Sequence, residues 1–317
     1  MLKSFRCSLL LILITMMFFP ATLVFAKTYT IGVAWEGKSS MQDRIAQGMN
    51  EVLENSASTI AVEWHKELDT LDQLSNIVDT FQSEKNGMVI LRSSGAEYLA
   101  KNPPVIPSFI GGCNNPVQLG LVAELQKPTG NITGVTYFIS YDIYFGIFTK
   151  ILPHLNSVLL LYEEGHSASV IDRNGTKNIC GELGIKYQEI GIKQKEDLTN
   201  LSKTATEGLS AVILGNQSLI FDNADIILSS FANTPVLAYS STPVDKGVLC
   251  GVAADDVKLG KMLGESIIDV IVNGKSIADV PIKTDTEPKI YINLNATEKF
   301  NLRLPVNILK TAVLVEE

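Results

Sequence analysis

The first part of the chain alternates between short apolar runs and stretches whose apolar residues recur every three to four positions. Runs of the first kind predict buried strands, and stretches of the second kind predict amphipathic helices. The predicted strands are 29–35, 60–64, 88–91 and 105–110, and the predicted helices are 41–53, 71–81 and 96–100. Strands that alternate with helices pair in parallel, so the pattern predicts a doubly wound α/β sheet.

The same alternation begins again near residue 158. The second set of predicted strands is 158–162, 187–190, 211–214 and 235–239, with helices at 171–179, from 198 onward and at 224–231. Two similar α/β lobes in series account for this repeat. The segment from 247 onward is too short for a third lobe, so its predicted helix and late strand are expected to complete the first two.

The repeat predicts that each lobe is built from two segments of the chain. Lobe 1 is expected to contain 27–137 and 247–283, and lobe 2 is expected to contain 138–246 and 284–317. The chain would then cross between the lobes near 136–137, 246–247 and 284–285. Crossings of this kind act as a hinge between two parallel-sheet lobes.

Residues 1–26 carry the pattern of a secretory signal peptide. Lys3 and Arg6 precede an apolar run, and Ala26 closes a small-residue cleavage site. The apolar run is short for a membrane span of about 20 residues. We therefore expect a mature chain that begins at Lys27 and works in the periplasm or another extracytoplasmic space.

Charge and motif content exclude several classes of protein. The 317 residues include 34 Asp and Glu against 26 Lys and Arg, a net charge of −8 that does not favour a nucleic-acid partner. Cys113, Cys180 and Cys250 form no CxxC pair, and the three histidines lie far apart, so neither a metal site nor a cofactor is expected. No GxSxG, HExxH or Cys–His signature of catalysis is present.

Polar and aromatic residues follow the predicted strands of both lobes. In open α/β sheets, ligands bind beyond the carboxyl ends of the strands. The candidate ligand-binding residues, which include Tyr137 at the first crossing, are Trp35, Glu36, Arg92, Ser93, Ser94, Asn114, Asn115, Tyr137, Glu163, Asn216, Tyr239 and Ser240. This set is rich in hydrogen-bonding groups and poor in strong catalysts, so it favours recognition of a small molecule over bond breaking.

Each candidate has a role that fits its chemistry. Arg92, with donors from Ser93 and Ser94, is expected to hold a carboxylate, because a guanidinium group matches it with two hydrogen bonds. Glu36 or Glu163 would hold an ammonium group. The expected aromatic cover is Trp35, Tyr137 and Tyr239, and the expected orienting groups are Asn114, Asn216 and Ser240. An alternative is a secreted hydrolase that uses Glu163 and Glu164 as an acid–base pair.

Several stretches resemble one known family. They are Pro107–Ile110, Asn115–Val122, Pro128–Val135, Leu183–Ile185 and the C-terminal Ile292–Leu294 with Leu304-Pro305. The chain resembles the ABC-transporter substrate-binding proteins of the tryptophan/tyrosine-binding type, which have the type I periplasmic-binding-protein fold. The chain departs from the family pattern at three places: Asn115 stands where Asp is usual, Thr129 replaces a glycine, and Asn301-Leu302 stands where the ending usually has Leu-Gly.

The resemblance implies a function for the two lobes. A monomeric receptor would enclose a small molecule in the cleft between the lobes and deliver it to a membrane permease. An amino acid is the expected ligand, and an aromatic one is favoured. A receptor domain that reports its ligand to a membrane signalling partner remains an alternative, because it requires the same closure.

Overall fold

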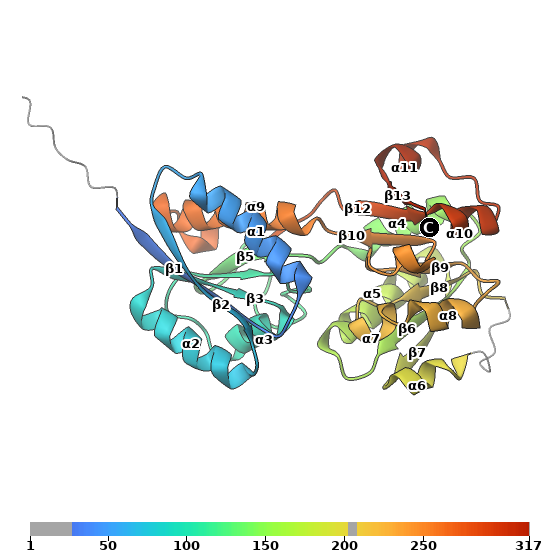
Figure 1. Ribbon diagram of the computed structural model, residues 1–317, viewed down its shortest axis with the longest axis horizontal. Helices are drawn as coiled ribbons and strands as arrows, with labels where there is room; N and C mark the ends of the chain where they lie inside the picture. Colours follow the sequence, from blue (N-terminus) through green and yellow to red (C-terminus); the bar gives the residue numbers. More distant parts are fainter. Residues whose placement is uncertain (1–26, 202–207, 317) are drawn as a thin grey trace, which may run out of the picture.

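The computed structural model describes residues 27–201 and 208–316 as two α/β lobes that lie side by side (Figure 1). The expected signal peptide, residues 1–26, lies outside the described residues. Within the described part of the chain, no helix has the length and apolar character needed to cross a membrane.

Lobe 1 contains a six-stranded sheet in the order β11-β5-β4-β3-β1-β2, and every pairing in it is parallel. Its strands are β1 Tyr29–Glu36, β2 Ile60–Leu68, β3 Gly87–Leu91, β4 Ser108–Gly111, β5 Ile132–Thr136 and β11 Lys283–Thr284. The central strands β3, β4 and β5 are buried along their whole length. Near-continuous apolar runs are what a parallel sheet requires, because helices cover both of its faces.

The helices of lobe 1 form a layer on each face of this sheet (Figure 1). They are α1 Ser40–Glu54, α2 Leu71–Glu84, α3 Ser93–Lys101 and α9 Asp256–Ile267, followed by the π-helix η3 Ile268–Val272 and the 3₁₀-helix η4 Ile277–Asp279. Helices α1 and α9 share one face and approach closely at glycines: a Cβ on Gly48 would lie 2.1 Å from the carbonyl oxygen of Val257. This approach brings the first turns of both helices to the same edge of the lobe.

Lobe 2 contains a seven-stranded sheet in the order β13-β12-β10-β9-β8-β6-β7. Its strands are β6 Ser157–Glu163, β7 Lys186–Ile192, β8 Ala211–Leu214, β9 Val236–Ala238, β10 Cys250–Ala253, β12 Lys289–Asn293 and β13 Val313–Val315. Only the β10–β12 pairing is antiparallel among these described strands. The helices are α4 Tyr141–Ile151, α5 Ser167–Leu183, α6 Lys195–Leu198, α7 Ser218–Phe221, α8 Ala224–Ser230, η2 Val244–Lys246, α10 Leu294–Lys299 and α11 Val306–Thr311.

One domain boundary lies elsewhere than the sequence pattern predicts. Strand β10 pairs with β9 and β12 in lobe 2, so the chain crosses at Ala254–Asp255 and not at 246–247. The run 248–254 is apolar, but it lies directly before the helix pattern of α9, so the sequence alone does not show which lobe it joins. The first crossing lies between β5 and α4, and the third lies between β11 and β12.

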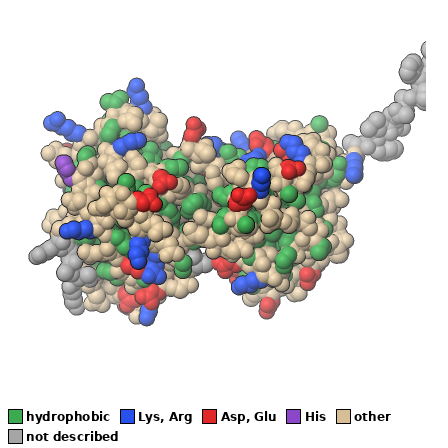
Figure 2. Space-filling model, turned by 180° about the vertical axis from the view of Figure 1, so that it is seen from behind, with side chains coloured by type: hydrophobic (Ala, Val, Ile, Leu, Met, Phe, Trp, Pro, Cys, Tyr) green, Lys and Arg blue, Asp and Glu red, His purple; other side chains and the backbone are tan. Residues whose placement is uncertain are grey.

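Two further features of the described residues bear on function. Cys113, Cys180 and Cys250 are free and buried, and burial raises the pKa of the Cys113 and Cys180 thiols to about 12. On the face shown in Figure 2, acidic and basic side chains are interspersed over both lobes. Neither feature provides a reactive thiol or a basic surface for a polyanion.

Candidate functional site

Three adjoining spaces form a cleft between the lobes. The hinge-side cavity has a volume of about 520 Å³ and lies next to the second crossing. The α3-side cavity, about 240 Å³, lies at the first turn of α3, and a small recess of about 10 Å³ lies beside α4 and α5. Tyr137 and Asn216 line all three spaces, so the three spaces meet at these two residues.

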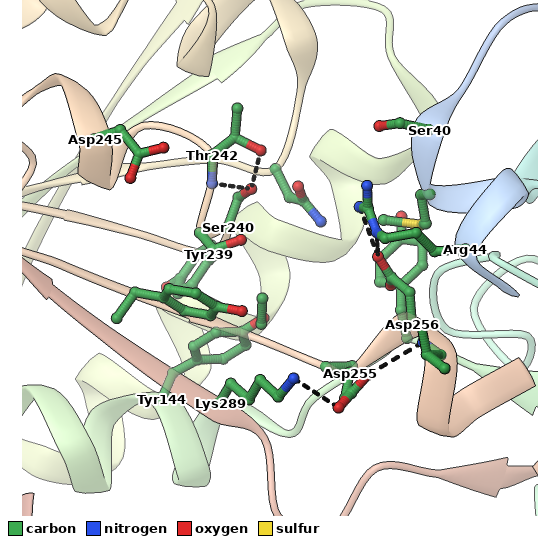
Figure 3. Close-up of a pocket in the computed structure, with 18 residues that line it drawn as sticks. Ser40, Arg44, Tyr144, Tyr239, Ser240, Thr242, Asp245, Asp255, Asp256 and Lys289 are labelled. Atoms are coloured by element: carbon green, nitrogen blue, oxygen red, sulfur yellow. Dashed lines mark hydrogen bonds and ion pairs between the residues drawn. The ribbon is translucent and has the colours of Figure 1, made fainter. Parts of the chain in front are cut away.

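Two ion pairs line the hinge-side cavity (Figure 3). Arg44 on α1 pairs with Asp256 at 2.7 Å, and Lys289 on β12 pairs with Asp255 at 2.7 Å. Asp255 also caps α9, because its carboxylate accepts the backbone N–H groups of Val257 and Lys258. Partial burial acts to raise the pKa of Asp255, but these donors together hold it below its usual range. The Lys289–Asp255 pair joins lobe 2 to lobe 1 at the hinge.

Arg92 is the cation of the α3-side cavity. It lies directly after β3 with φ of +76° and ψ of 163°, a backbone region that is almost restricted to glycine. One guanidinium nitrogen donates to the carbonyl oxygen of Glu36 at 2.6 Å. Within 27–201 and 208–316 no carboxylate pairs with Arg92, so the group is available to an anionic ligand. Ser93 beside it accepts the backbone N–H of Asn114 at 3.1 Å.

Asp172 on α5 forms the floor of the recess and is 3% exposed. Its Oδ2 accepts the backbone N–H of Asn216 at 2.9 Å and the amide of Gln217 at 2.6 Å. Its Oδ1 accepts the hydroxyl of Tyr141 at 3.0 Å. Burial is the main cause that raises the pKa of this carboxyl, and the three donors oppose it.

Tyrosine rings surround this carboxylate. The ring centroids of Tyr144 and Tyr239 lie 4.5 Å apart, and those of Tyr141 and Tyr239 lie 5.4 Å apart. The hydroxyl groups of Tyr239 and Thr176 form a hydrogen bond of 2.7 Å. Burial raises the pKa of Tyr239 well above its usual value, so the hydroxyl stays neutral at any ordinary pH.

The structure brings together most of the residues that the sequence singles out. The predicted residues that line one or more of the three spaces are Arg92, Ser93, Ser94, Asn114, Tyr137, Asn216, Tyr239 and Ser240. They come from both lobes and from the first crossing. The predicted residues that line none of these spaces are Trp35, Glu36, Asn115 and Glu163.

These four residues have other surroundings. Trp35 is 0% exposed in the core of lobe 1, so it does not face the cleft. Glu36 contributes only its backbone carbonyl, to Arg92. The Asn115 side chain accepts the backbone N–H groups of Val117 and Gln118 in its own loop. The backbone of Glu163 accepts the hydroxyl of Ser169.

Several cleft residues do not follow the end of a strand, so the rule that ligands bind beyond strand ends does not find them. They are Arg44 on α1, Tyr144 on α4, Asp172 on α5 and Lys289 on β12. Asp172 lies six positions after the N-cap of its helix, among polar neighbours that read as an ordinary solvated face. Its neighbour Ile171 belongs to the apolar pattern of the helix, but adjacent residues do not share a helix face, so the sequence gives no signal for Asp172.

The chain is similar to several known proteins. A "Tyrosine-binding protein" of Clostridioides difficile (strain R20291) is 23% identical over 285 residues, 87% of this chain and 82% of the relative. The ligand-free, open structure of a Clostridium difficile substrate binding protein with adhesive properties has a TM-score of 0.79 at 22% identity and covers 91% of this chain and 99% of its own.

A second solved structure, an ABC domain from Streptococcus pneumoniae in complex with L-Trp, has a TM-score of 0.74 at 19% identity and covers 91% of this chain and 100% of its own. These likenesses show the type I periplasmic-binding-protein fold that the sequence predicts. The family model for "ABC transporter substrate binding protein" matches residues 31–316. This match supports a binding protein rather than the hydrolase alternative. The chain belongs to the ABC transporter substrate binding protein family.

Proposed function

We propose that this protein is an extracytoplasmic receptor that binds an aromatic amino acid between its lobes and delivers it to an ABC permease. The observation that carries the proposal is the meeting of three spaces at Tyr137 and Asn216. An amino acid has three substituents that diverge from one carbon. A cavity with a cation, a recess with an acid and a larger cavity lined in part by tyrosines lie around one point, and this arrangement matches that shape.

Different lining residues bind different parts of the amino acid. Arg92, with Ser93 and Ser94 beside it, binds the carboxylate in the α3-side cavity. The aromatic side chain enters the hinge-side cavity, where Tyr137, Tyr144, Tyr239 and Tyr291 supply apolar surface. A dissociation constant of about 1 μM corresponds to about −8 kcal/mol. Two or three charge-assisted hydrogen bonds at about 1.5–3 kcal/mol each, with ring burial, reach that value after the costs of ordering.

Closure of the lobes completes the site. In the described chain, the extensive packing between helices and strands lies within each lobe. The walls of the cleft are therefore free to approach each other around a ligand by rotation at the three crossings. A permease that recognises the closed arrangement of the two lobes would accept only the loaded receptor.

Identification of the bound molecule tests the proposal. Freshly purified protein is denatured, and released small molecules are identified by mass spectrometry. Refolded, ligand-free protein is then titrated calorimetrically with L-tyrosine, L-tryptophan and L-phenylalanine, with L-leucine and myo-inositol as controls. We expect micromolar or tighter binding of at least one aromatic amino acid. Binding of none of the three would refute the proposed ligand class.

Delivery needs a separate assay, because a signalling receptor would bind in the same way. Cells that lack this protein are compared with cells that carry it for uptake of the radiolabelled amino acid. Uptake that falls on deletion and returns with the wild-type gene supports transport. Unchanged uptake with intact binding favours the signalling alternative.

A further inference from the structure

Asp172 is a buried carboxylate that faces a cavity without a cation. The side chain is 3% exposed and lines the recess. The lining residues of the recess, all of them in the described part of the chain, include no lysine or arginine. A buried carboxylate without a positive partner is costly, so the site gains when a cation enters.

The hydrogen bonds of Asp172 leave room for one more donor. Oδ2 already accepts from Asn216 and Gln217, whereas Oδ1 accepts, among the residues that the structure describes, only from the Tyr141 hydroxyl. A carboxylate oxygen has two lone pairs, so Oδ1 can take a further donor from the recess. Oδ1 is thus the atom at which a cationic N–H group would bind.

The walls of the recess suit a cation as well. Aromatic rings of Tyr137, Phe138, Tyr141, Tyr144 and Tyr239 line it. Ring faces attract cations within about 6 Å, and cages of such rings are used in proteins to hold ammonium groups. Carboxylate and rings therefore favour the same kind of ligand group.

We infer that the recess between Asp172 and the tyrosine rings binds the primary ammonium group of the ligand. This inference rests on the proposed function of the cleft and assigns to Asp172 the role that the sequence pattern gives to Glu36 or Glu163. The volume of about 10 Å³ holds one group the size of a water molecule. A primary ammonium group fits this space, and a trimethylammonium group does not.

The test compares ligands that differ only in the ammonium group. The probes are L-tyrosine with 3-(4-hydroxyphenyl)propanoate, tyramine and N,N,N-trimethyl-L-tyrosine, and L-tryptophan with indole-3-propanoate and tryptamine. Wild-type protein should bind the preferred amino acid at least about tenfold more tightly than its desamino or trimethyl analogue. Asp172→Asn should lose this preference and bind the amino acid and its desamino analogue with similar affinity.

A matched control distinguishes the effect of the charge on Asp172 from the effect of removing any acidic charge from the same helix. Glu182 lies on the same helix but is exposed, so Glu182→Gln should keep the wild-type preference. Circular dichroism and thermal unfolding show whether each variant is folded. Should Asp172→Asn fail to fold, Tyr141→Phe, which removes one donor to Oδ1, should instead increase the preference for the ammonium group.

The outcomes distinguish this inference from the proposed function. Equal binding of the amino acid and its desamino analogue by the wild type overturns the inference and leaves the proposed ligand class intact. Binding of tyramine or tryptamine that depends on Asp172, without binding of any amino acid, supports the inference and overturns the ligand class. If no probe that carries an ammonium group binds, both are overturned.

Discussion

Gly175 on α5 provides the space in which Tyr141 packs beside Asp172. A Cβ placed on Gly175 would lie 1.9 Å from Cε2 and 2.2 Å from Cδ2 of the Tyr141 ring, far inside van der Waals contact. Gly175→Ala must therefore displace the ring, at a typical overpacking cost of about 1–3 kcal/mol. Displacement also weakens the hydrogen bond from Tyr141 to Asp172, which is worth about 1.5–3 kcal/mol when the carboxyl is charged.

Helix propensity acts in the opposite direction, because alanine favours a helix interior by about 1 kcal/mol over glycine. The net expectation for Gly175→Ala is a loss of about 1–3 kcal/mol in the free energy of unfolding, measured by urea denaturation. Since Tyr141 lines the recess, the affinity for the amino acid should also fall by about tenfold, or ~1.4 kcal/mol.

Gly181 on the same helix is the matched control. A Cβ there would meet no atom within 4 Å, so Gly181→Ala should raise the free energy of unfolding by about 0.5–1 kcal/mol and leave ligand binding unchanged. The reasoning fails if Gly175→Ala is stabilised as much as Gly181→Ala and binds the ligand as tightly as the wild type.

Three further predictions address the cleft. Arg92→Gly should weaken amino-acid binding by about ten- to a hundredfold in calorimetry without lowering the free energy of unfolding, because relief of about 1–3 kcal/mol of backbone strain offsets the lost bond to Glu36; a large loss of stability would contradict the strain. Lys289→Met should change the urea-unfolding free energy by no more than about 1 kcal/mol, because the Lys289 side chain is 48% exposed in its pair with Asp255; a larger loss would show a stronger pair. Burial raises the pKa of Asp172, so the folded state keeps a proton that the unfolded chain releases, and stability falls as pH rises from the unfolded pKa of about 3.9 toward the folded value. Asp172→Asn should therefore lose less stability than the wild type between about pH 4 and pH 7, and an unchanged slope would mean that Asp172 has an ordinary pKa.

The order of helices and strands is largely predictable because each lobe is a parallel sheet buried on both faces. Such strands read as apolar runs, as in 88–91 and 211–214, and the helices between them show a regular apolar face. The strands that the pattern misses are β5, the short β11 and β13 at the ends of the sheets, and β10 next to a crossing. Strands of two to five residues are too short to show a clear period, and their pairing depends on partners far away in the chain.

The cleft is less predictable, and the reason lies in the pleat of a strand. Successive side chains of a strand point to opposite faces of its sheet, and helices cover both faces here. Trp35 and Glu36 are the last two residues of β1, and Glu163 is the last residue of β6, so these side chains stay with their sheets. Residues that follow the end of a strand are no longer held in this alternation, so their side chains can point toward the cleft.

Arg92 follows β3, and Tyr239 and Ser240 follow β9, and all three line the cleft. A difference of one or two residues at the end of a strand thus decides whether a side chain joins the core or lines the cleft, and apolar periodicity does not resolve strand ends that finely. The position of a residue relative to a strand end says nothing about Asp172, because Asp172 lies on helix α5 and lines the recess from there. The packing of α5 against Tyr141, made possible by the missing side chain of Gly175, places this acid at the recess.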